Sequence, residues 1–346
     1  MAQNYLLNYT EMDIDTVYII MQNDCDMNCS LCNTKHDNKI KISSGVIEYL
    51  LRLAHIRPLC NINPIRVVFY GGEPLLKIDL IKDICAKLGF INFKYVIRTD
   101  CIGLSQDIVN YINEHNISLE FYSECENTKI IRGREDILSD NRTLYLIKDI
   151  NNIIVRTTLC GLNYDINHIF CYLYEKLGKE VQVMFEWLKC NENTKREFYY
   201  INEEKFSNTF SVFLSKARND LISHRFSNKL QAINTDLQAI INPPMELVPR
   251  CNEIRKKMNI DLDGNIHVCH SSEAFGTISD SYSKLVNIFD SKYNQAFNFA
   301  DCSYCKYVRV CQAGCPTDYP CEAKYNLCKI RVLYYQMLEE FLKEVV

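Results

Sequence analysis

The sequence has no apolar run long enough to cross a bilayer, no long run of lysine or arginine, and no internal repeat or low-complexity segment. A spanning helix needs roughly 20 apolar residues, so no membrane-spanning helix is predicted. Without a basic run, neither nucleic acid nor a membrane surface is the expected partner. The first eight residues lack the basic segment and apolar core of a signal peptide, so we expect a cytoplasmic protein.

The chain has 346 residues, a net charge of −4 and 47% hydrophobic residues, enough for a buried core in two domains or one elaborated domain. It contains 18 cysteines, and without a signal peptide these favour metal or redox use over a disulfide scaffold. Cys85 and Cys171 fall within helical patterns and are predicted to be buried. Cys101 and Cys125 lie near predicted strand ends and are weak active-site candidates.

Three cysteines, Cys25, Cys29 and Cys32, follow an apolar strand predicted over Val17–Met21. Three thiolates at this spacing bind one side of a cubane iron–sulfur cluster and leave the fourth iron without a protein ligand. Such an open iron can bind and activate a small molecule. A zinc site is the alternative, but zinc sites normally show a second Cys or His pair, and none lies near these three.

This spacing resembles the Cys-x-x-x-Cys-x-x-Cys signature of radical S-adenosylmethionine (SAM) enzymes. A second motif of that family, Gly71-Gly72-Glu73-Pro74, follows the strand predicted over Ile65–Tyr70. Alone it would be an ordinary turn with a solvated glutamate. The resemblance implies that this turn holds the methionine amino group of SAM. The amino and carboxylate groups of SAM would cap the open iron, and an electron from the cluster would cleave SAM to a 5′-deoxyadenosyl radical.

The resemblance also implies further SAM contacts. Thr99 and Asp100 align with a segment after the third strand, and Ser123 matches a serine that contacts the ribose. Arg132 or Arg134 is expected to bind the SAM carboxylate, because arginine suits bidentate binding; a solvated start of a helix is the alternative. The family's Asp-Gly after the serine is replaced here by Cys125-Glu126.

Strand and helix patterns alternate from residue 16 to about 190, which predicts parallel strands with right-handed crossovers. Both motifs follow strands, at the carboxyl ends where parallel barrels carry their chemistry. The predicted fold is α/β: a partial (β/α)6 radical SAM barrel over residues 1–240, followed by a small cysteine-rich domain over 241–346. The predicted strands are Val17–Met21, Ile65–Tyr70, Phe93–Arg98, Ile117–Tyr122, Ile153–Leu159 and Val181–Phe185, and the predicted helices are Ser44–Ala54, Ile78–Leu88, Ser105–Glu114, Arg134–Ile147, Asp165–Leu177, and a bridging helix from Glu203 to about Leu237.

The C-terminal cysteines resemble those of the SPASM domain, an extension of radical SAM enzymes that carries two auxiliary 4Fe–4S clusters. A hairpin with Asp263-Gly264 in its turn and a C-terminal helix, Ile330–Glu344, complete the predicted domain. The resemblance implies a first auxiliary cluster on Cys251, Cys269 and Cys315. Its fourth ligand is Cys321, or one of its irons is open.

By the same resemblance, the second auxiliary cluster binds Cys302, Cys305, Cys311 and a last cysteine. Cys328, predicted just before the C-terminal helix, is preferred to Cys321 as that ligand. A zinc ribbon is the alternative, built from the first three and Cys315.

Auxiliary clusters suit a net oxidation, so the favoured function is oxidative cross-linking of a ribosomally made peptide. Alternatives are formylglycine formation as in sulfatase maturases, a small-molecule dehydrogenase or cofactor-biosynthesis enzyme, and a non-enzymatic electron carrier. His270 stands where the sulfatase-maturing branch has an aspartate, and is a candidate base. About fifteen residues precede the first strand, so we expect leader recognition from the barrel, the SPASM part or another protein. A flavodoxin or ferredoxin is the expected reductant.

Overall fold

The computed structural model describes residues 14–21, 41–55, 63–190, 193–245, 256–269, 272–293, 302–312 and 322–345. The chain divides into two compact units. The first unit comprises residues 1–121, 145–152 and 252–293, and the second comprises 122–144, 153–251 and 294–346. The predicted domain boundary after residue 240 stays a prediction.

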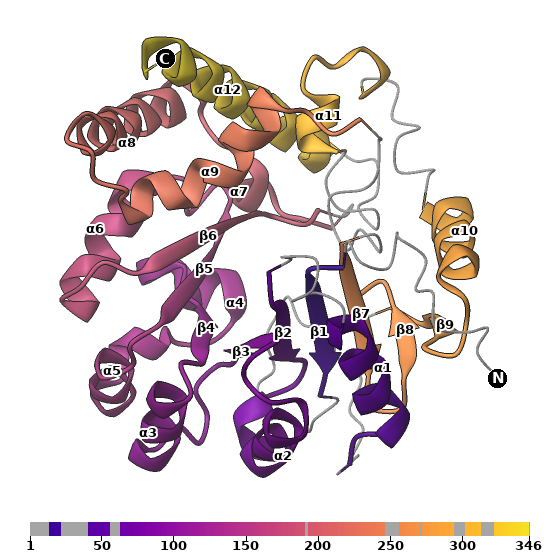
Figure 1. Ribbon diagram of the computed structural model, residues 1–346. Coiled ribbons are helices and arrows are strands. Elements are labelled where there is room, and N and C mark those ends of the chain that lie inside the picture. Colours follow the sequence, from indigo (N-terminus) through magenta and orange to yellow (C-terminus); the bar gives the residue numbers. More distant parts are fainter. Residues whose placement is uncertain are drawn as a thin grey trace. The chain divides into compact units, whose positions relative to one another are not determined.

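A mostly parallel sheet forms the first unit, with neighbouring strands in the order β4-β3-β2-β1-β7-β8-β9 (Figure 1). Strands β1 to β4 pair in parallel, and β7 pairs in parallel with β1. Strands β7, β8 and β9 pair antiparallel. The strands are β1 (Thr16–Ile20), β2 (Ile65–Tyr70), β3 (Phe93–Arg98), β4 (Ser118–Tyr122, its last residue in the second unit), β7 (Lys257–Asp261), β8 (Asn265–His267) and β9 (Ala274–Thr277).

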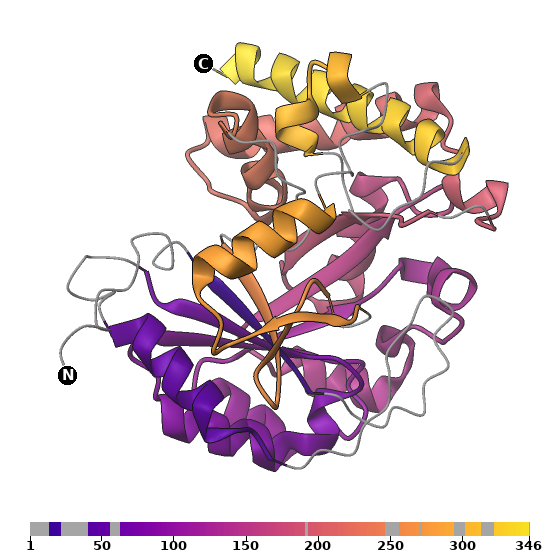
Figure 2. The ribbon, with the colours of Figure 1, turned by 90° about the vertical axis from the view of Figure 1, so that its right-hand side faces the viewer.

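Helices connect the parallel strands of the first unit, as the alternating pattern predicts. In α2 the buried residues Ile81, Ile84, Cys85 and Leu88 follow the helical period, so one face of the helix packs into the core. Helix α10 packs on β9 (Figure 2). The helices are α1 (Ser44–His55), the short 3-10 helix η3 (Pro74–Lys77), α2 (Ile78–Leu88), α3 (Gln106–Glu114) and α10 (Tyr282–Tyr293).

The hairpin of β7 and β8 is confirmed. Gly264 has a φ of +93°, a conformation that suits glycine in a tight turn. The Asp261 carboxylate accepts hydrogen bonds from the backbone N–H groups of Asp263 (3.0 Å) and Asn265 (2.9 Å). Although burial opposes it, these bonds and the His267 side chain hold the Asp261 pKa well below its usual value. The hairpin thereby fixes the strand that leads into Cys269.

In the second unit, β5 and β6 pair in parallel. Helix α12 packs against α8 and α9 (Figure 1). The aromatic rings of Phe210 and Tyr334 stack with centroids 5.0 Å apart, and Trp187 meets Tyr334 edge-on at 5.8 Å. The elements are β5 (Ile153–Leu159), β6 (Gln182–Trp187), η4 (Cys125–Asn127), α4 (Thr128–Arg132), η5 (Ile137–Ser139), α6 (Ile166–Leu177), α7 (Arg196–Tyr199), α8 (Glu203–Ile222), α9 (Asn228–Ile241), η7 (Cys302–Tyr304), α11 (Val308–Cys311) and α12 (Glu322–Val345); α5 (Asn141–Lys148) belongs to both units.

The helix predicted over Arg134–Ile147 is wrong in its first half. The Asp136 carboxylate accepts the N–H of Leu138 at 3.2 Å and caps η5, so the α-helix begins only at Asn141. The bridging helix is two helices, because His224 between them adopts a φ of +54°.

Two cysteine predictions also need correction. Helix α12 begins at Glu322 rather than Ile330, so Cys328 lies inside the helix and does not precede it. Cys171 is exposed on the outer face of α6, whereas Cys85 is buried as predicted. The buried residues of α6 are Ile166, Ile169, Leu173 and Leu177, so Cys171 does not lie on the buried face of this helix.

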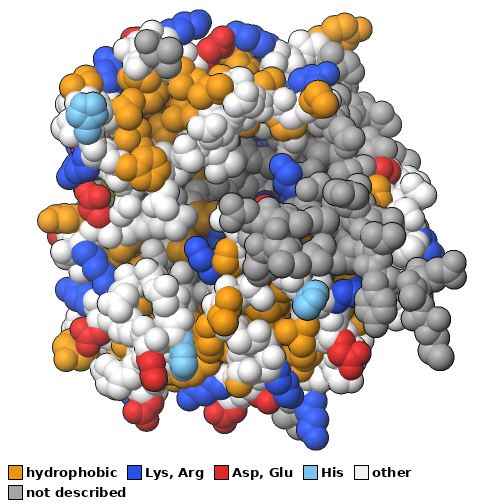
Figure 3. Space-filling view, in the orientation of Figure 1, with side chains coloured by type: hydrophobic (Ala, Val, Ile, Leu, Met, Phe, Trp, Pro, Cys, Tyr) orange, Lys and Arg blue, Asp and Glu red, His pale blue; other side chains and the backbone are white. Residues whose placement is uncertain are grey.

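No helix among the described residues is long and apolar enough to cross a membrane. Hydrophobic side chains do gather on the surface over α8 and α9 (Figure 3). Ile222 and Phe226, at the connection between these helices, are 68% and 70% exposed. Clustered apolar side chains in water are typical of contact surfaces.

Candidate functional site

The turn Gly71–Pro74 directly follows β2 in the first unit. Gly71 and Gly72 both have positive φ values, +90° and +56°, which glycine adopts at little cost. A Cβ on Gly71 would lie 3.2 Å from Cγ2 of Ile20, so the turn packs closely on the end of β1. The Met21 N–H donates to the Tyr70 carbonyl at 2.8 Å. The turn thus lies beside the strand that continues toward Cys25.

The carboxylate of Glu73 joins this turn to the loop after β3. It is fully buried and accepts the backbone N–H of Leu75 at 3.0 Å, the backbone N–H of Asp100 at 2.7 Å, and the hydroxyl of Thr99. Burial raises the Glu73 pKa to about 7, against the lowering effect of these donors. The structure therefore brings together the predicted residues Gly71–Pro74, Thr99 and Asp100, and makes Glu73 a positioning residue.

Polar side chains that the sequence reading missed lie on the same strands. Arg98 pairs with the buried carboxylate of Glu120, and its guanidinium lies 5.4 Å from the ring centroids of both Tyr18 and Tyr70. The Tyr70 hydroxyl donates to Oδ1 of Asn259 at 2.6 Å. The signal was present as charged and polar residues inside apolar strands, where a buried parallel sheet normally has none.

The predicted SAM contacts of the second unit are held by neighbours from that unit. Ser123 Oγ donates to the Asp136 carboxylate at 2.9 Å. Arg132 Nε donates to Glu124 at 2.7 Å, and its guanidinium lies 3.8 Å from the ring centroid of Tyr122. Arg134 is buried and donates to the carbonyl oxygens of Tyr122 and Glu135. Arg132 is thus already paired with the carboxylate of Glu124.

Four cysteines of the second unit line one cavity of about 70 Å³. They are Cys302, Cys305, Cys311 and Cys328, and the buried cations Lys324 and Arg331 line the same cavity. Burial and the other three thiols raise the Cys302 pKa to about 11, while Lys324 opposes the shift. Four sulfur donors fit a 4Fe–4S cluster or zinc, and buried cations offset the net negative charge of either thiolate complex.

Cys328 is therefore placed with the three cysteines that the sequence grouped, although it comes from inside α12. Cys269 follows β8, and its N–H donates to Ser272 Oγ at 3.1 Å. The other candidate ligands and the candidate base lie outside the described residues: Cys25, Cys29, Cys32, Cys251, Cys315, Cys321 and His270.

No protein-family model matches the chain. Structural comparison finds native anSMEcpe with bound AdoMet (that is, SAM) at a TM-score of 0.66 and 16% identity, over 95% of this chain and 98% of that one. Streptococcus suis SuiB gives a TM-score of 0.55 at 14% identity, over 90% of this chain and 77% of SuiB. The chain has the fold of radical SAM enzymes. The fold class predicted from the sequence is confirmed by these two likenesses.

Sequence comparison adds two partial matches. The radical SAM cyclopropyl synthase TigE of Paramaledivibacter caminithermalis is 24% identical over 165 residues, which is 42% of this chain and 35% of TigE. An uncharacterized protein, MJ0907 of Methanocaldococcus jannaschii, is 29% identical over 142 residues, 37% of this chain. The match spans 47% of that protein, so the matched part is less than half of either relative.

Proposed function

We propose that the chain is a radical SAM oxidoreductase that cross-links a ribosomally synthesised peptide oxidatively. The observation that carries this proposal is the fold likeness to anSMEcpe, which extends over 95% of the chain and so includes the C-terminal cysteine region. The structure of anSMEcpe with a Cp18Cys peptide has the same likeness, with a TM-score of 0.67. A peptide is therefore the substrate class with the most direct support.

In this proposal each part of the first unit has a separate task. Cys25, Cys29 and Cys32 would bind a 4Fe–4S cluster, and the Gly71–Pro74 turn would bind the methionine amino group of SAM. When bound, the clusters and SAM supply a 5′-deoxyadenosyl radical that removes a substrate hydrogen atom, and an acceptor for the electron that the substrate then loses. Glu73 keeps the turn and the Thr99–Asp100 loop in one geometry.

Ser123 and one arginine are the further proposed SAM contacts, and both belong to the second unit. Arg134 is the better candidate for the SAM carboxylate, because Arg132 already binds the Glu124 carboxylate and Thr158. Ser123 would exchange its bond to Asp136 for the ribose.

Two auxiliary clusters complete the proposed cofactor set. Cys302, Cys305, Cys311 and Cys328 would bind one, supported by their common cavity and its two buried cations. Cys251, Cys269 and Cys315 would bind the other, with Cys321 or an open iron at the fourth position. These cysteines belong to the proposed SPASM domain, residues 241–346, which follows the proposed barrel domain, residues 1–240.

His270, next to Cys269, would take up the proton released on oxidation of the substrate. A flavodoxin or ferredoxin would reduce the first cluster, and the cytoplasmic location stays a prediction.

The test is mass spectrometry of a short peptide encoded beside the gene, after anaerobic co-expression with this chain. The expected product has lost two hydrogens, and fragmentation locates the new bond. A variant with Cys25, Cys29 and Cys32 changed to Ala should leave the peptide unmodified, while Cys171→Ala, at an exposed cysteine, should not matter.

Two outcomes would overturn the cross-linking proposal. An aldehyde at a former cysteine or serine would assign formylglycine formation instead. An unmodified peptide from cells in which SAM is cleaved would point to a small molecule or a protein side chain.

A further inference from the structure

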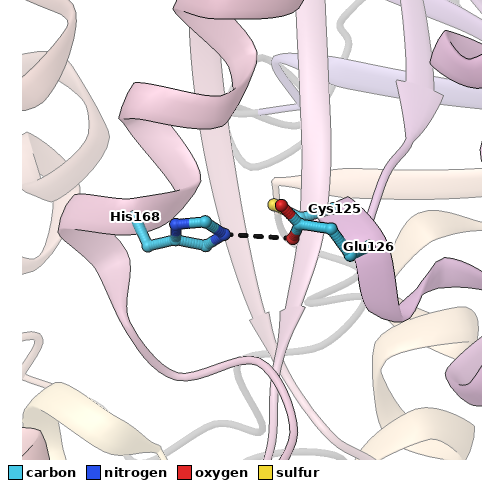
Figure 4. Close-up of side chains that lie close together, drawn as sticks. All are labelled: Cys125, Glu126 and His168. Atoms are coloured by element: carbon cyan, nitrogen blue, oxygen red, sulfur yellow. Dashed lines mark hydrogen bonds and ion pairs between the residues drawn. The ribbon is translucent and has the colours of Figure 1, made fainter.

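Three potential metal ligands of different chemistry meet in the second unit. The Cys125 sulfur, a Glu126 carboxylate oxygen and a His168 ring nitrogen all lie within 4.8 Å of one another. Figure 4 shows the three side chains pointing toward a common point from two elements. Cys125 and Glu126 begin η4, and His168 lies in the first turn of α6, where Asp165 caps the helix by accepting the His168 N–H at 3.0 Å.

The loop holds the sulfur in place through its backbone. Cys125 adopts a φ of +55°, a left-handed conformation that costs a residue with a Cβ roughly 1–2 kcal/mol. Two side chains fix that conformation: Ser123 Oγ accepts the Cys125 N–H at 3.3 Å, and Thr128 Oγ1 donates to the Cys125 carbonyl at 2.8 Å. The sulfur position is thus set by the fold. Strained backbone of this kind is concentrated at functional sites.

The other two groups lie close to the separation of neighbouring metal ligands. Glu126 Oε2 and His168 Nε2 are 3.0 Å apart and form a hydrogen bond. Bonds of about 2.0–2.2 Å from zinc to nitrogen and oxygen put such atoms roughly 3.3–3.6 Å apart in a tetrahedral site, so a shift of about half an ångström would suffice. Both side chains are more than half exposed, so they can turn toward the sulfur without disturbing the core.

A cavity of about 360 Å³ adjoins Cys125 and Glu126. It is large enough to admit an ion and to leave a water molecule as the fourth ligand. Its lining includes the carboxyl groups of Glu135, Asp136 and Glu175 and the ammonium groups of Lys129 and Lys176. A thiolate, a carboxylate and a neutral imidazole would together balance the charge of a divalent cation.

We propose that Cys125, Glu126 and His168 form a binding site for a single divalent transition-metal ion, with the fourth position open to the cavity. Sulfur, nitrogen and oxygen donors together suit Zn²⁺, and Zn²⁺ is the probe for the test. The ion would take the place of the hydrogen bond between Glu126 and His168 and would connect η4 to α6. The site is separate from the cysteines assigned to iron–sulfur clusters and does not depend on the proposed peptide chemistry.

The test uses the anaerobically reconstituted holoenzyme, in which iron occupies the cluster cysteines. The protein is equilibrated with Zn²⁺ under competition from a chelator, and bound zinc and iron are counted for wild type, Cys125→Ala, His168→Gln and the control Cys171→Ala. Cys171 lies on α6, as His168 does, and is exposed. X-ray absorption at the zinc edge reports the ligands without interference from iron.

Wild type and the control should bind one more zinc per chain than the two site variants, with at least a tenfold higher affinity. The zinc of the wild type should show one sulfur ligand, and Cys125→Ala should lose it. Equal zinc binding in all four proteins would overturn the proposal, as would bound zinc without a sulfur ligand. His168→Gln changes an exposed side chain, so loss of zinc in that variant with full iron content is not a folding defect.

Discussion

Two cysteine sites in the second unit, one with four cysteines and one with Cys125 alone, differ in their charged neighbours. Cys302, Cys305, Cys311 and Cys328 line a cavity together with Lys324 and Arg331, and none of the described residues that line it is acidic. Burial raises the pKa of Cys328, and the two cations counteract it. The Cys125 thiol has Glu126, Asp136 and Glu124 near it, and burial and these anions both raise its pKa strongly.

The difference in charged neighbours indicates what each cysteine site can bind. A cluster held by four thiolates is anionic, and buried cations stabilise it. A lone thiol among carboxyl groups is a poor place for a cluster, but a divalent cation there would meet opposite charge and convert the thiol to a thiolate. The neighbours, more than the residue type, separate a cluster ligand from a candidate ligand of a single ion.

The largest effect is expected from removing one ligand at each place. Cys328→Ala should lose iron, at most one auxiliary cluster of roughly four iron atoms per chain, because it removes one of the four thiolates proposed to bind that cluster. Cys125→Ala should keep the full iron content of the wild type. Iron analysis and Mössbauer spectra of anaerobically reconstituted protein measure both. Full iron in Cys328→Ala would remove Cys328 from the ligand set and return Cys321 as the candidate.

In the first unit, the buried carboxyl group of Glu73 tests whether the neighbours of a side chain also determine its charge there. The folded pKa of Glu73, about 7, lies above its ordinary value of 4.5 because of burial. Between these two values the folded chain binds the proton and the unfolded chain does not. Glu73 therefore contributes stability below about pH 4.5 that is lost as the pH rises through 7, on the order of 3 kcal/mol.

Infrared difference spectra of the holoenzyme measure this titration. A protonated carboxyl band should disappear between roughly pH 6 and 8, and Glu73→Gln should abolish it. Glu114→Gln, at an exposed acid of α3, is the control and should keep the band. A wild-type band that has already disappeared by pH 5 would show that the three hydrogen-bond donors outweigh burial.

Removing one cation beside the four cysteines should have a smaller effect. Lys324→Met should lower the reduction potential of the auxiliary cluster by tens of millivolts, because a nearby positive charge favours the reduced, more negative state. Lys329→Met, on the same helix but exposed, should leave the potential within error of wild type. Redox titrations followed by electron paramagnetic resonance give both values. Equal potentials in the two variants would contradict the assigned role of the buried cation.

The smallest effect is expected on zinc affinity at the proposed Cys125 site. Asp136→Asn removes one of the anions that face the thiol, so zinc affinity should fall roughly threefold, about 0.6 kcal/mol. Chelator competition resolves a change of this size. Glu135→Gln, at an exposed residue of the same cavity, is the control and should change the affinity less. An increase in zinc affinity in Asp136→Asn would show that this carboxyl group does not act through its charge.

Much of the fold could be predicted because the strands carry a strong local signal. The bounds of β2, β3 and β5 agree with the sequence prediction to the residue, since β-branched and aromatic runs end at polar loops. The start of α5 and the break after α8 could not be predicted from the sequence. They depend on the cap by Asp136 and on the left-handed backbone of His224. Helix α12 begins early because Ala323 and Leu327 extend its buried face by two turns.

In the candidate site, too, some contacts could be predicted from the sequence and others could not. The Gly71–Pro74 turn and the Thr99–Asp100 loop follow adjacent parallel strands, so their proximity is predictable. The pairs Arg98–Glu120 and Arg132–Glu124 are not, because each depends on the register or spacing of segments that the sequence leaves open. The same holds for His168, whose meeting with Cys125 needs the packing of α6 against η4.

The most direct test of the central claim is to measure 5′-deoxyadenosine after adding SAM and a strong reductant to the anaerobically reconstituted chain. Wild type and Cys171→Ala should produce it, and a variant with Cys25, Cys29 and Cys32 changed to Ala should not, although its auxiliary clusters remain. A wild-type preparation with its full iron content that cleaves no SAM would contradict the account and would favour an iron–sulfur electron carrier.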